Sequence, residues 1–305
     1  MEFHGKLMKV DFRNAKLHGA DFRGANLIKA LFTKTNLKYA LLHDANLIKA
    51  NLKSANLKYA QLTSANLSFA KLGPAKNAKS KDRQLRANPK CVKKCKGANL
   101  THADLTKADL TGVDLTNANL NYADLRGAKL TGAKLSGATL QGATLTGLNL
   151  SKLDLTNVDL EGANLEYANL SGATLEGADL FVADMDNVNL EGANLTQATL
   201  RYATLEQADL TNADLTQTNA RNADMSQADL TGVQLASADL YEANLVDADL
   251  KGANLFAANL EKAFLLRANL TGATVAGANF CNATMPNGSI NKDACSPQPS
   301  VEVTG

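Results

Sequence analysis

The sequence predicts an all-β solenoid, and three observations support that prediction: a five-residue period, a recurrence of outward positions every twenty residues, and a scarcity of aromatic side chains. Alanine and a large apolar residue stand two positions apart and return every five residues, as in Ala25-Asn26-Leu27 and Ala45-Asn46-Leu47. Aromatic residues make up 5% of the chain and Trp is absent. This composition suits a narrow interior filled by Leu and Ala.

A five-residue step fits neither an α-helix nor a plain strand. In a helix the step advances roughly 140° beyond a full turn, so the apolar side chains would spiral around the surface. In a strand an odd spacing would send successive leucines to opposite faces. We therefore expect a short extended triplet, whose first and third side chains point inward, followed by a two-residue corner.

The twenty-residue recurrence predicts four sides per coil. The segment 25–30 returns unchanged as 45–50, and the segment 36–40 returns as 56–60. Like residues are then expected to stack as ladders between neighbouring coils. A recent duplication would give the same pattern, so this observation supports four sides without proving them.

These A(D/N)LXX repeats resemble the pentapeptide-repeat family. Their centres run from Leu7 to Leu72 as 14 repeats and from Leu100 to Phe280 as 37 repeats. The resemblance implies a right-handed quadrilateral β-helix of about 13 coils, on the order of 60 Å long at one coil per 4.8 Å. The ending Ala-Thr-Met-Pro-Asn-Gly at 283–288 is similar to that of cyanobacterial members.

The frame of five divides the chain into four parts. Residues 1–72 form a first repeat block, 73–97 a basic loop or linker, 98–285 a second block, and 286–305 a C-terminal cap and disordered tail. The spacing of 28 between Leu72 and Leu100 breaks the frame, and the intervening Pro and Gly residues are typical of a loop. The pattern is compatible with one continuous solenoid from which the segment loops out, and also with two solenoids in tandem. We favour the first, because separate solenoids would expose additional unpaired edges.

One coil of the second block departs from the consensus at its inward positions. Leu148, Leu153 and Val158 replace alanine on three successive sides. The added methylenes predict that this coil widens or shifts.

Charge divides the chain more sharply than its near-neutral total suggests. Residues 1–97 contain 21 Lys and Arg against 5 Asp and Glu, whereas residues 98–305 contain 11 against 25. Such asymmetry points to a charged partner or to self-association.

The acidic block contains a candidate interaction ladder. Asp209, Asp229 and Asp249 are twenty residues apart, so we expect them on one side in consecutive coils. Like charges in neighbouring strands are mildly destabilising. The ladder is either a solvated wall, which the consensus allows, or part of a DNA-like surface. The second interpretation rests on the resemblance, because quinolone-resistance members of the family imitate duplex DNA and bind DNA gyrase.

The basic part contains a candidate patch for nucleic acid or an anionic surface. Lys29 stacks over Lys49 and Lys38 over Lys58 in the expected coils, and aromatic residues lie beside the second pair. The loop supplies further cations to this patch, namely Lys79, Lys81, Arg83, Arg86, Lys93 and Lys94. The alternative interpretation is that the loop is only a solvated linker.

Four cysteines form two sequence pairs, Cys91 with Cys95 and Cys281 with Cys295. A zinc site needs four convergent ligands, and the pairs stand far apart in the sequence. We expect disulfides or buried caps at the ends of the blocks, with Cys95 as the first inward residue of the second block.

The sequence predicts no enzyme and no bound metal or cofactor. The histidines do not fall at catalytic spacing from Cys or carboxylates, and no phosphate-binding glycine loop or metal-binding helix motif is present. No apolar run reaches the roughly 20 residues of a membrane span, and no secretory signal is visible. A cytoplasmic location is therefore expected, and a processed exported form is compatible with the sequence.

The predicted function is a rigid, non-enzymatic scaffold that mediates protein–protein interaction through its charge-polarised surface. The alternative is a DNA-mimicking binder of a topoisomerase or another DNA-binding protein. A third hypothesis is binding of nucleic acid or an anionic surface by the basic half. Salt-sensitive association of two copies, with the basic end of one rod on the acidic wall of another, is also expected.

Overall fold

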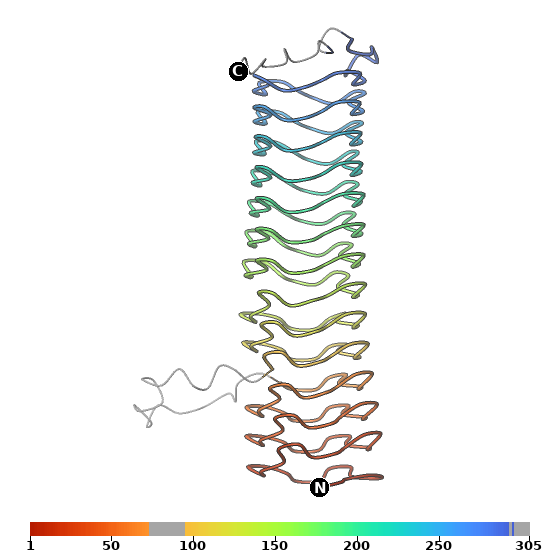
Figure 1. Cartoon of the computed structure of the whole chain (residues 1–305), viewed down its shortest axis with the longest axis vertical. Helices are drawn as coiled ribbons and strands as arrows, with labels where there is room; N and C mark the ends of the chain where they lie inside the picture. The colour runs from red at the N-terminus through yellow and green to blue at the C-terminus, as the bar shows by residue number, and fades with distance from the viewer. Residues whose placement is uncertain (73–94, 293–294, 296–305) are drawn as a thin grey trace, which may run out of the picture.

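Parallel backbone pairing between residues twenty apart builds the whole molecule. The computed structural model describes residues 1–72, 95–292 and Cys295 and is a stack of coils, with the N-terminal repeats at one end and the coils that precede Cys281 at the other (Figure 1). No helix occurs in these residues, and the extended segments pair through single-residue bridges that run from Glu2–Asp21 to Phe264–Thr284. The twenty-residue step confirms the prediction of four repeats per coil.

Inward leucines define the four sides of each coil. We number the sides by these columns: face 1 contains Leu47, face 2 contains Leu52, face 3 contains Leu57 and face 4 contains Leu62. Each of these leucines is at most 2% exposed, and the alanines two positions earlier are equally buried. Each buried Leu contributes about 1.5–3 kcal/mol of transfer free energy, so the core is thin but continuous along the rod.

The corners use a backbone conformation that most residues avoid. The second corner residue has a positive φ throughout, for example 57° at Tyr59 and 65° at Gly97. The turn closes when the next alanine donates to the preceding leucine, as in Ala30 N to Leu27 O at 2.9 Å. Glycine adopts this conformation without strain. At Gly97 an added methyl group would also lie 3.0 Å from Cε1 of Tyr59.

The two repeat blocks stack directly on one another. Lys71 pairs with Asp109, a spacing of 38 in place of 20, and Leu72 N donates to Asp109 O at 2.9 Å. Faces 4 and 1 continue in the same way, with Leu62 N bonded to Asn99 O and Leu67 N to Asp104 O, both at 2.7 Å. The 18 extra residues of the insert therefore fall between Leu72 on face 2 and Cys95 on face 3.

The insert ends earlier than the predicted residue 97. Cys95 is 2% exposed and belongs to the core, in the leucine column of face 3 between Leu57 and Leu115. Its N–H donates to Asp114 O at 3.2 Å, and Gly97 N donates to Thr116 O at 3.1 Å. Residues 95–97 thus belong to the second block.

The bulky coil opens the stack on two faces. Lys129 and Lys134 are expected to pair with the residues twenty positions later, in the coil of Leu150 and Leu155. Neither bridge occurs among the described residues. The backbone bonds expected from Leu130 N and Leu135 N are likewise missing from these residues, whereas Leu125 N still donates to Thr144 O on face 1. We call this opening on faces 2 and 3 the seam.

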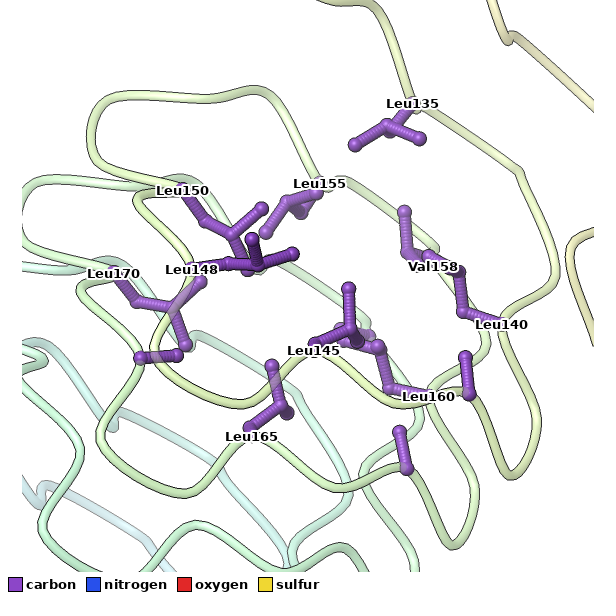
Figure 2. Close-up of a cluster of buried hydrophobic side chains, with 14 of the residues drawn as sticks. Leu135, Leu140, Leu145, Leu148, Leu150, Leu155, Val158, Leu160, Leu165 and Leu170 are labelled. Atoms are coloured by element: carbon purple, nitrogen blue, oxygen red, sulfur yellow. The ribbon is translucent and has the colours of Figure 1, made fainter. Parts of the chain in front are cut away.

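Leucine at the alanine position explains the seam. Leu148 and Leu153 lie at that position on faces 2 and 3 and are 2% and 6% exposed; Figure 2 shows Leu148 beside Leu150 in the coil interior. Val158 occupies the same position on face 4, yet Leu140 N still donates to Asp159 O at 2.7 Å. The predicted widening is therefore confined to the two faces that carry leucine, because the shorter β-branched side chain of Val158 fits without separating the coils.

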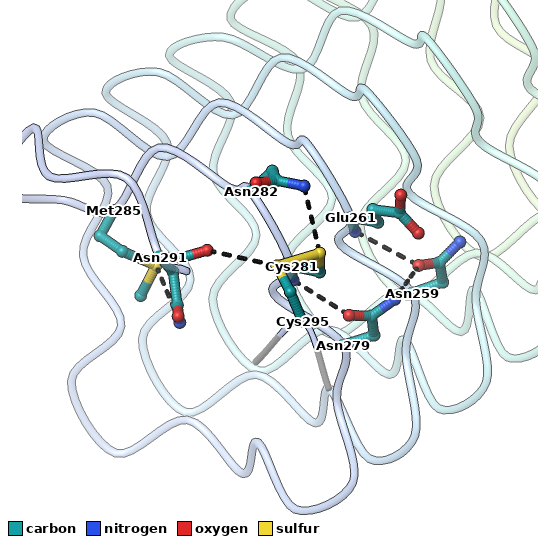
Figure 3. The surroundings of a disulfide bond; sticks show 8 residues. All are labelled: Asn259, Glu261, Asn279, Cys281, Asn282, Met285, Asn291 and Cys295. Atoms are coloured by element: carbon teal, nitrogen blue, oxygen red, sulfur yellow. Dashed lines mark hydrogen bonds between the residues drawn. A yellow bond between two sulfur atoms is a disulfide. The ribbon is translucent and has the colours of Figure 1, made fainter. Parts of the chain in front are cut away.

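Each end of the stack is closed differently. At the N-terminal end, Phe3 stacks on Phe22 with ring centroids 4.7 Å apart and Phe12 on Phe32 at 5.0 Å, which fills the lumen. At the C-terminal end, Cys281 and Cys295 form a disulfide (Figure 3). After Met285 the chain doubles back, and Ile290 and Asn291 lie beside residues 282–284, where face 4 meets face 1.

Backbone hydrogen bonds hold this returning segment. Asn282 N donates to Asn291 O at 2.8 Å, and Asn291 N donates to Ala283 O at 2.9 Å. Thr284 and Ile290 form the antiparallel bridge of the described pairing. The cap therefore begins within the last coil, before the predicted residue 286.

Candidate functional site

The predicted acidic ladder lies on face 2. Asp209 pairs with Asp229 and Asp229 with Asp249, so the three residues occupy consecutive coils. Each carboxylate accepts a hydrogen bond from the backbone N–H two residues later, at 2.9–3.0 Å. These contacts close the corner in the manner of an Asx turn. The ladder thus stabilises the corners and presents three aligned negative charges to solvent.

The predicted basic columns lie on diagonally opposite corners of the rod. Lys29 and Lys49 occupy the corner between faces 1 and 2, whereas Lys38 and Lys58 occupy the corner between faces 3 and 4. The ammonium groups of Lys38 and Lys58 lie 4.6 and 4.8 Å from the ring centroids of the tyrosines that follow them, Tyr39 and Tyr59. The two columns therefore form separate surfaces.

Several predicted residues lie outside the described part of the chain: Lys79, Lys81, Arg83, Arg86, Cys91, Lys93 and Lys94. Of the predicted cysteines, Cys95 is buried and Cys281 is bonded to Cys295. No group of three or more His, Cys, Asp or Glu residues that could hold a metal ion occurs among residues 1–72, 95–292 and Cys295. The same residues contain no helix that is long and apolar enough to cross a membrane.

The structure reveals a further surface at the corner between faces 4 and 1, which we call the arginine–aromatic strip. Its members occupy the two corner positions in successive coils of the acidic block. They are Phe181, Arg201, Tyr202, Arg221, Tyr241 and Lys262.

Cation–π contacts join the strip. The Arg201 guanidinium lies 5.9 Å from the Phe181 ring centroid and 5.7 Å from that of Tyr202. The Arg221 guanidinium lies 4.1 Å from the Tyr241 ring centroid. Tyr202 is nevertheless 47% exposed, so the strip offers aromatic surface as well as positive charge.

Acidic neighbours fix the far end of the strip. Arg221 Nη1 lies 3.0 Å from Asp239 Oδ2, and this hydrogen bond raises the pKa of the arginine. Lys262 donates to the Tyr241 hydroxyl, which raises the lysine pKa, and lies 3.5 Å from Glu242 Oε1. Arg201 forms no ion pair within the described residues. It is therefore the cation of the strip that is most available to a partner.

The change in surface charge coincides with the seam. Residues 98–147 contain four Lys and Arg and four Asp and Glu, whereas residues 148–292 contain 7 and 19. The boundary at Gly97 expected from the sequence is therefore displaced by two and a half coils. The strongly acidic wall begins with Leu148, at the seam.

The family model for pentapeptide repeats matches the chain in overlapping segments that together span residues 6–68 and 94–285. The chain is a member of the pentapeptide-repeat family. Its coils accordingly form a right-handed quadrilateral β-helix, and the apolar columns, pairing and corners described above are those of the repeat.

Solved pentapeptide-repeat proteins show comparable sequences. HetL, involved in heterocyst differentiation regulation in the cyanobacterium Nostoc sp. strain PCC 7120, is 32% identical, with 85% of this chain and 93% of HetL covered and a TM-score of 0.30. Rfr23 from the cyanobacterium Cyanothece 51142 is 26% identical over 46% of this chain and 85% of its own, with a TM-score of 0.19. Full-length QnrB1, a plasmid-mediated fluoroquinolone resistance protein, is 19% identical over 75% and 92%, with a TM-score of 0.23. No curated protein matches the chain.

The strip escaped prediction because its residues lie at corner positions, which the consensus leaves open. A signal was nevertheless present in the sequence of this pentapeptide-repeat protein. Reading every twentieth residue from Phe181 gives Arg201, Arg221 and Tyr241, a run of large side chains where the other corners carry mostly Gly, Ser, Thr, Asn and Gln. The twenty-residue step, applied to outward positions of the second block, would have found it.

Proposed function

We propose that this pentapeptide-repeat protein is a non-enzymatic scaffold that binds another protein along its charge-polarised surface, with the arginine–aromatic strip as the main contact. The observation that carries the proposal is the strip itself. Arg and Tyr are enriched among the residues that dominate protein–protein binding energy. A rod with a continuous packed core holds the backbone under these side chains in fixed positions, so little conformational entropy is lost when a partner binds.

Affinity capture from a lysate of the source organism tests this proposal. The wild-type chain is compared with the double variant Arg201→Ala/Tyr202→Ala, and captured proteins are then purified and titrated directly. A partner should lose about tenfold or more in affinity for the variant, since truncated hot-spot residues cost about 2 kcal/mol or more.

The double variant Lys152→Ala/Lys251→Ala is the matched control, because it removes cations from the acidic block without touching the strip. The partner should bind this control as tightly as the wild type. The proposal fails if every captured protein binds the strip variant and the control equally.

A second candidate function is DNA mimicry, and the ladder of Asp209, Asp229 and Asp249 favours it. Three carboxylates in consecutive coils, about 4.8 Å apart, offer a basic DNA-binding groove a regular row of charges. Supercoiling by gyrase should then be inhibited by the wild-type chain. Inhibition should disappear in the triple Asp→Asn variant of the ladder and persist when Asp159, Asp179 and Asp214 are changed to Asn. Supercoiling that is unaffected by the wild-type chain excludes this candidate.

A further inference from the structure

A basic hollow lies where the two repeat blocks meet. It has a volume of about 410 Å³ and spans the corner between faces 1 and 2 together with face 2 itself. Its lining consists of Lys49, Phe69, Lys71, Lys107, Asp109 and Lys129. Only Lys49 belongs to the predicted basic patch. The insert hides the others, because Phe69 and Lys107 are neighbours in the stack but 38 residues apart in the chain.

An aromatic ring forms part of the hollow. Phe69 lies at the corner and is 45% exposed. The ammonium groups of Lys49 and Lys107, one coil to either side, each lie 5.5 Å from the centroid of its ring. Such an arrangement provides a stacking surface with positive charge on both sides of it.

The second wall of the hollow is a column on face 2. Lys71 pairs with Asp109, and Asp109 pairs with Lys129, so two ammonium side chains flank one carboxylate. Partial burial raises the pKa of Asp109, but hydrogen bonding from Thr111 and the charges of Lys53 and Lys129 lower it overall. Asp109 therefore stays ionised and offsets one of the four lysine charges.

The remaining positive charge has no counter-ion in the described structure. None of the four lysines forms an ion pair within residues 1–72 and 95–292. The same corner continues toward the N-terminus with Lys29 and Lys9, one residue per coil. The hollow thus lies on a basic track that follows the corner between faces 1 and 2.

We propose that this hollow binds a nucleotide, with the base stacked on Phe69 and the phosphates held by Lys71, Lys107 and Lys129. Its volume falls within the range of small-molecule sites, about 300–1,000 Å³. Bases stack on exposed aromatic side chains irrespective of sequence, and lysines supply the charge that phosphates require. A free nucleoside triphosphate and a single strand of nucleic acid share this chemistry, and the basic track would accommodate the neighbouring phosphates of a strand.

Calorimetric titration of the full chain at low salt tests the proposal, with ATP, inorganic triphosphate and a single-stranded oligonucleotide as separate probes. The wild-type chain should bind ATP, the oligonucleotide or both. Lys71→Gln/Lys129→Gln should weaken every probe. Phe69→Leu should weaken ATP or the oligonucleotide by about tenfold through loss of base stacking, while its effect on triphosphate should be within about twofold. Binding of the oligonucleotide without ATP identifies the strand as the ligand.

Matched variants in the acidic block, Phe256→Leu and Lys152→Gln/Lys251→Gln, should bind all probes like the wild type. All substituted side chains point outward, and thermal unfolding of each variant verifies that the fold is retained. The proposal is overturned if neither ATP nor the oligonucleotide binds, or if Phe69→Leu weakens triphosphate as much as it weakens the nucleotide probe. It is also overturned if the control variants lose affinity to the same extent.

Discussion

Two junctions between coils behave in opposite ways. At the insert the five-residue frame is interrupted between Leu72 and Cys95, yet the coils on either side are bonded to each other, with Leu72 N donating to Asp109 O. At the seam the chain is uninterrupted, yet Leu130 and Leu135 lose the corresponding bonds to the next coil within the described residues. Continuity of the chain therefore does not decide whether coils stack.

The size of the inward side chains decides it instead. On faces 4, 1 and 2 the coils at the insert keep alanine and leucine at their usual positions, so the extended segments approach to hydrogen-bonding distance. At the seam Leu148 and Leu153 add bulk where alanine is usual, and interiors at native packing density have no room for it. The seam also marks the point where a stretch of balanced charge, residues 98–147, gives way to the acidic wall.

Introducing a leucine pair at the alanine positions of a regular coil should have the largest effect on stability. Ala208→Leu/Ala213→Leu places the same bulk on faces 2 and 3 of a regular coil, so Leu190 and Leu195 should lose their bonds to Asp209 and Asp214. We expect a loss of about 2–6 kcal/mol in unfolding free energy, from about 1–3 kcal/mol for each overpacked site. Denaturant unfolding measures it.

Valine provides the control for this substitution. Val188 and Val233 occupy alanine positions naturally, and Leu170 N still donates to Asn189 O at 2.7 Å. Ala208→Val/Ala213→Val should therefore cost much less than the leucine pair. Equal losses for the two pairs would show that side-chain length is not the cause of the seam.

Removing the natural leucine pair should close the seam. Leu148→Ala/Leu153→Ala restores the consensus, so the amides of Leu130 and Leu135 should gain partners at Asn149 and Asp154. A backbone hydrogen bond contributes about 1 kcal/mol, so amide exchange at these two residues should slow about fivefold to tenfold relative to Leu110. If their exchange accelerates instead, the cavity left by the leucines dominates and the seam has another origin.

Much of this contrast was accessible from the sequence. The period of five and the recurrence of twenty predicted the coils, and the bulk of Leu148 and Leu153 predicted a disturbance at the right place. The sequence did not show that Val158 would be tolerated, because the limit lies between the lengths of Val and Leu and depends on the packing of one coil. Nor did it show the hollow around Phe69, because the insert changes the spacing between residues that stack.

Deleting the insert should have a small effect. Removal of residues 73–90 takes out the 18 extra residues and restores the spacing of twenty between Lys71 and Asp109. Loop length affects stability only weakly, so the unfolding free energy should change by no more than about 1 kcal/mol. Thermal unfolding measures this change. Loss of cooperative unfolding would instead mean that the insert is needed for stacking.

Acidification should have the smallest effect, at the N-terminal end of the rod. Hydrogen bonds from the Arg13 and Arg23 side chains lower the pKa values of Asp11 and Asp21 to about 2. A depressed folded-state pKa stabilises the fold above the unfolded value of about 3.9. That contribution should be lost as pH falls from about 4 to about 2, whereas Arg13→Gln/Arg23→Gln should remove it at all pH values. Thermal unfolding at pH 5 and pH 2 compares the two chains, and an equal loss in both would contradict this assignment.

Residue-resolved amide hydrogen exchange of the wild-type chain tests the central claim most directly, because it compares the two junctions in one molecule. The amides of Leu62, Leu67 and Leu72 at the insert should be as protected as those of regular coils. The amides of Leu130 and Leu135 at the seam should exchange fast, while that of Leu125 on the closed face of the same coil stays protected. Fast exchange at the insert with protection at the seam would contradict the account.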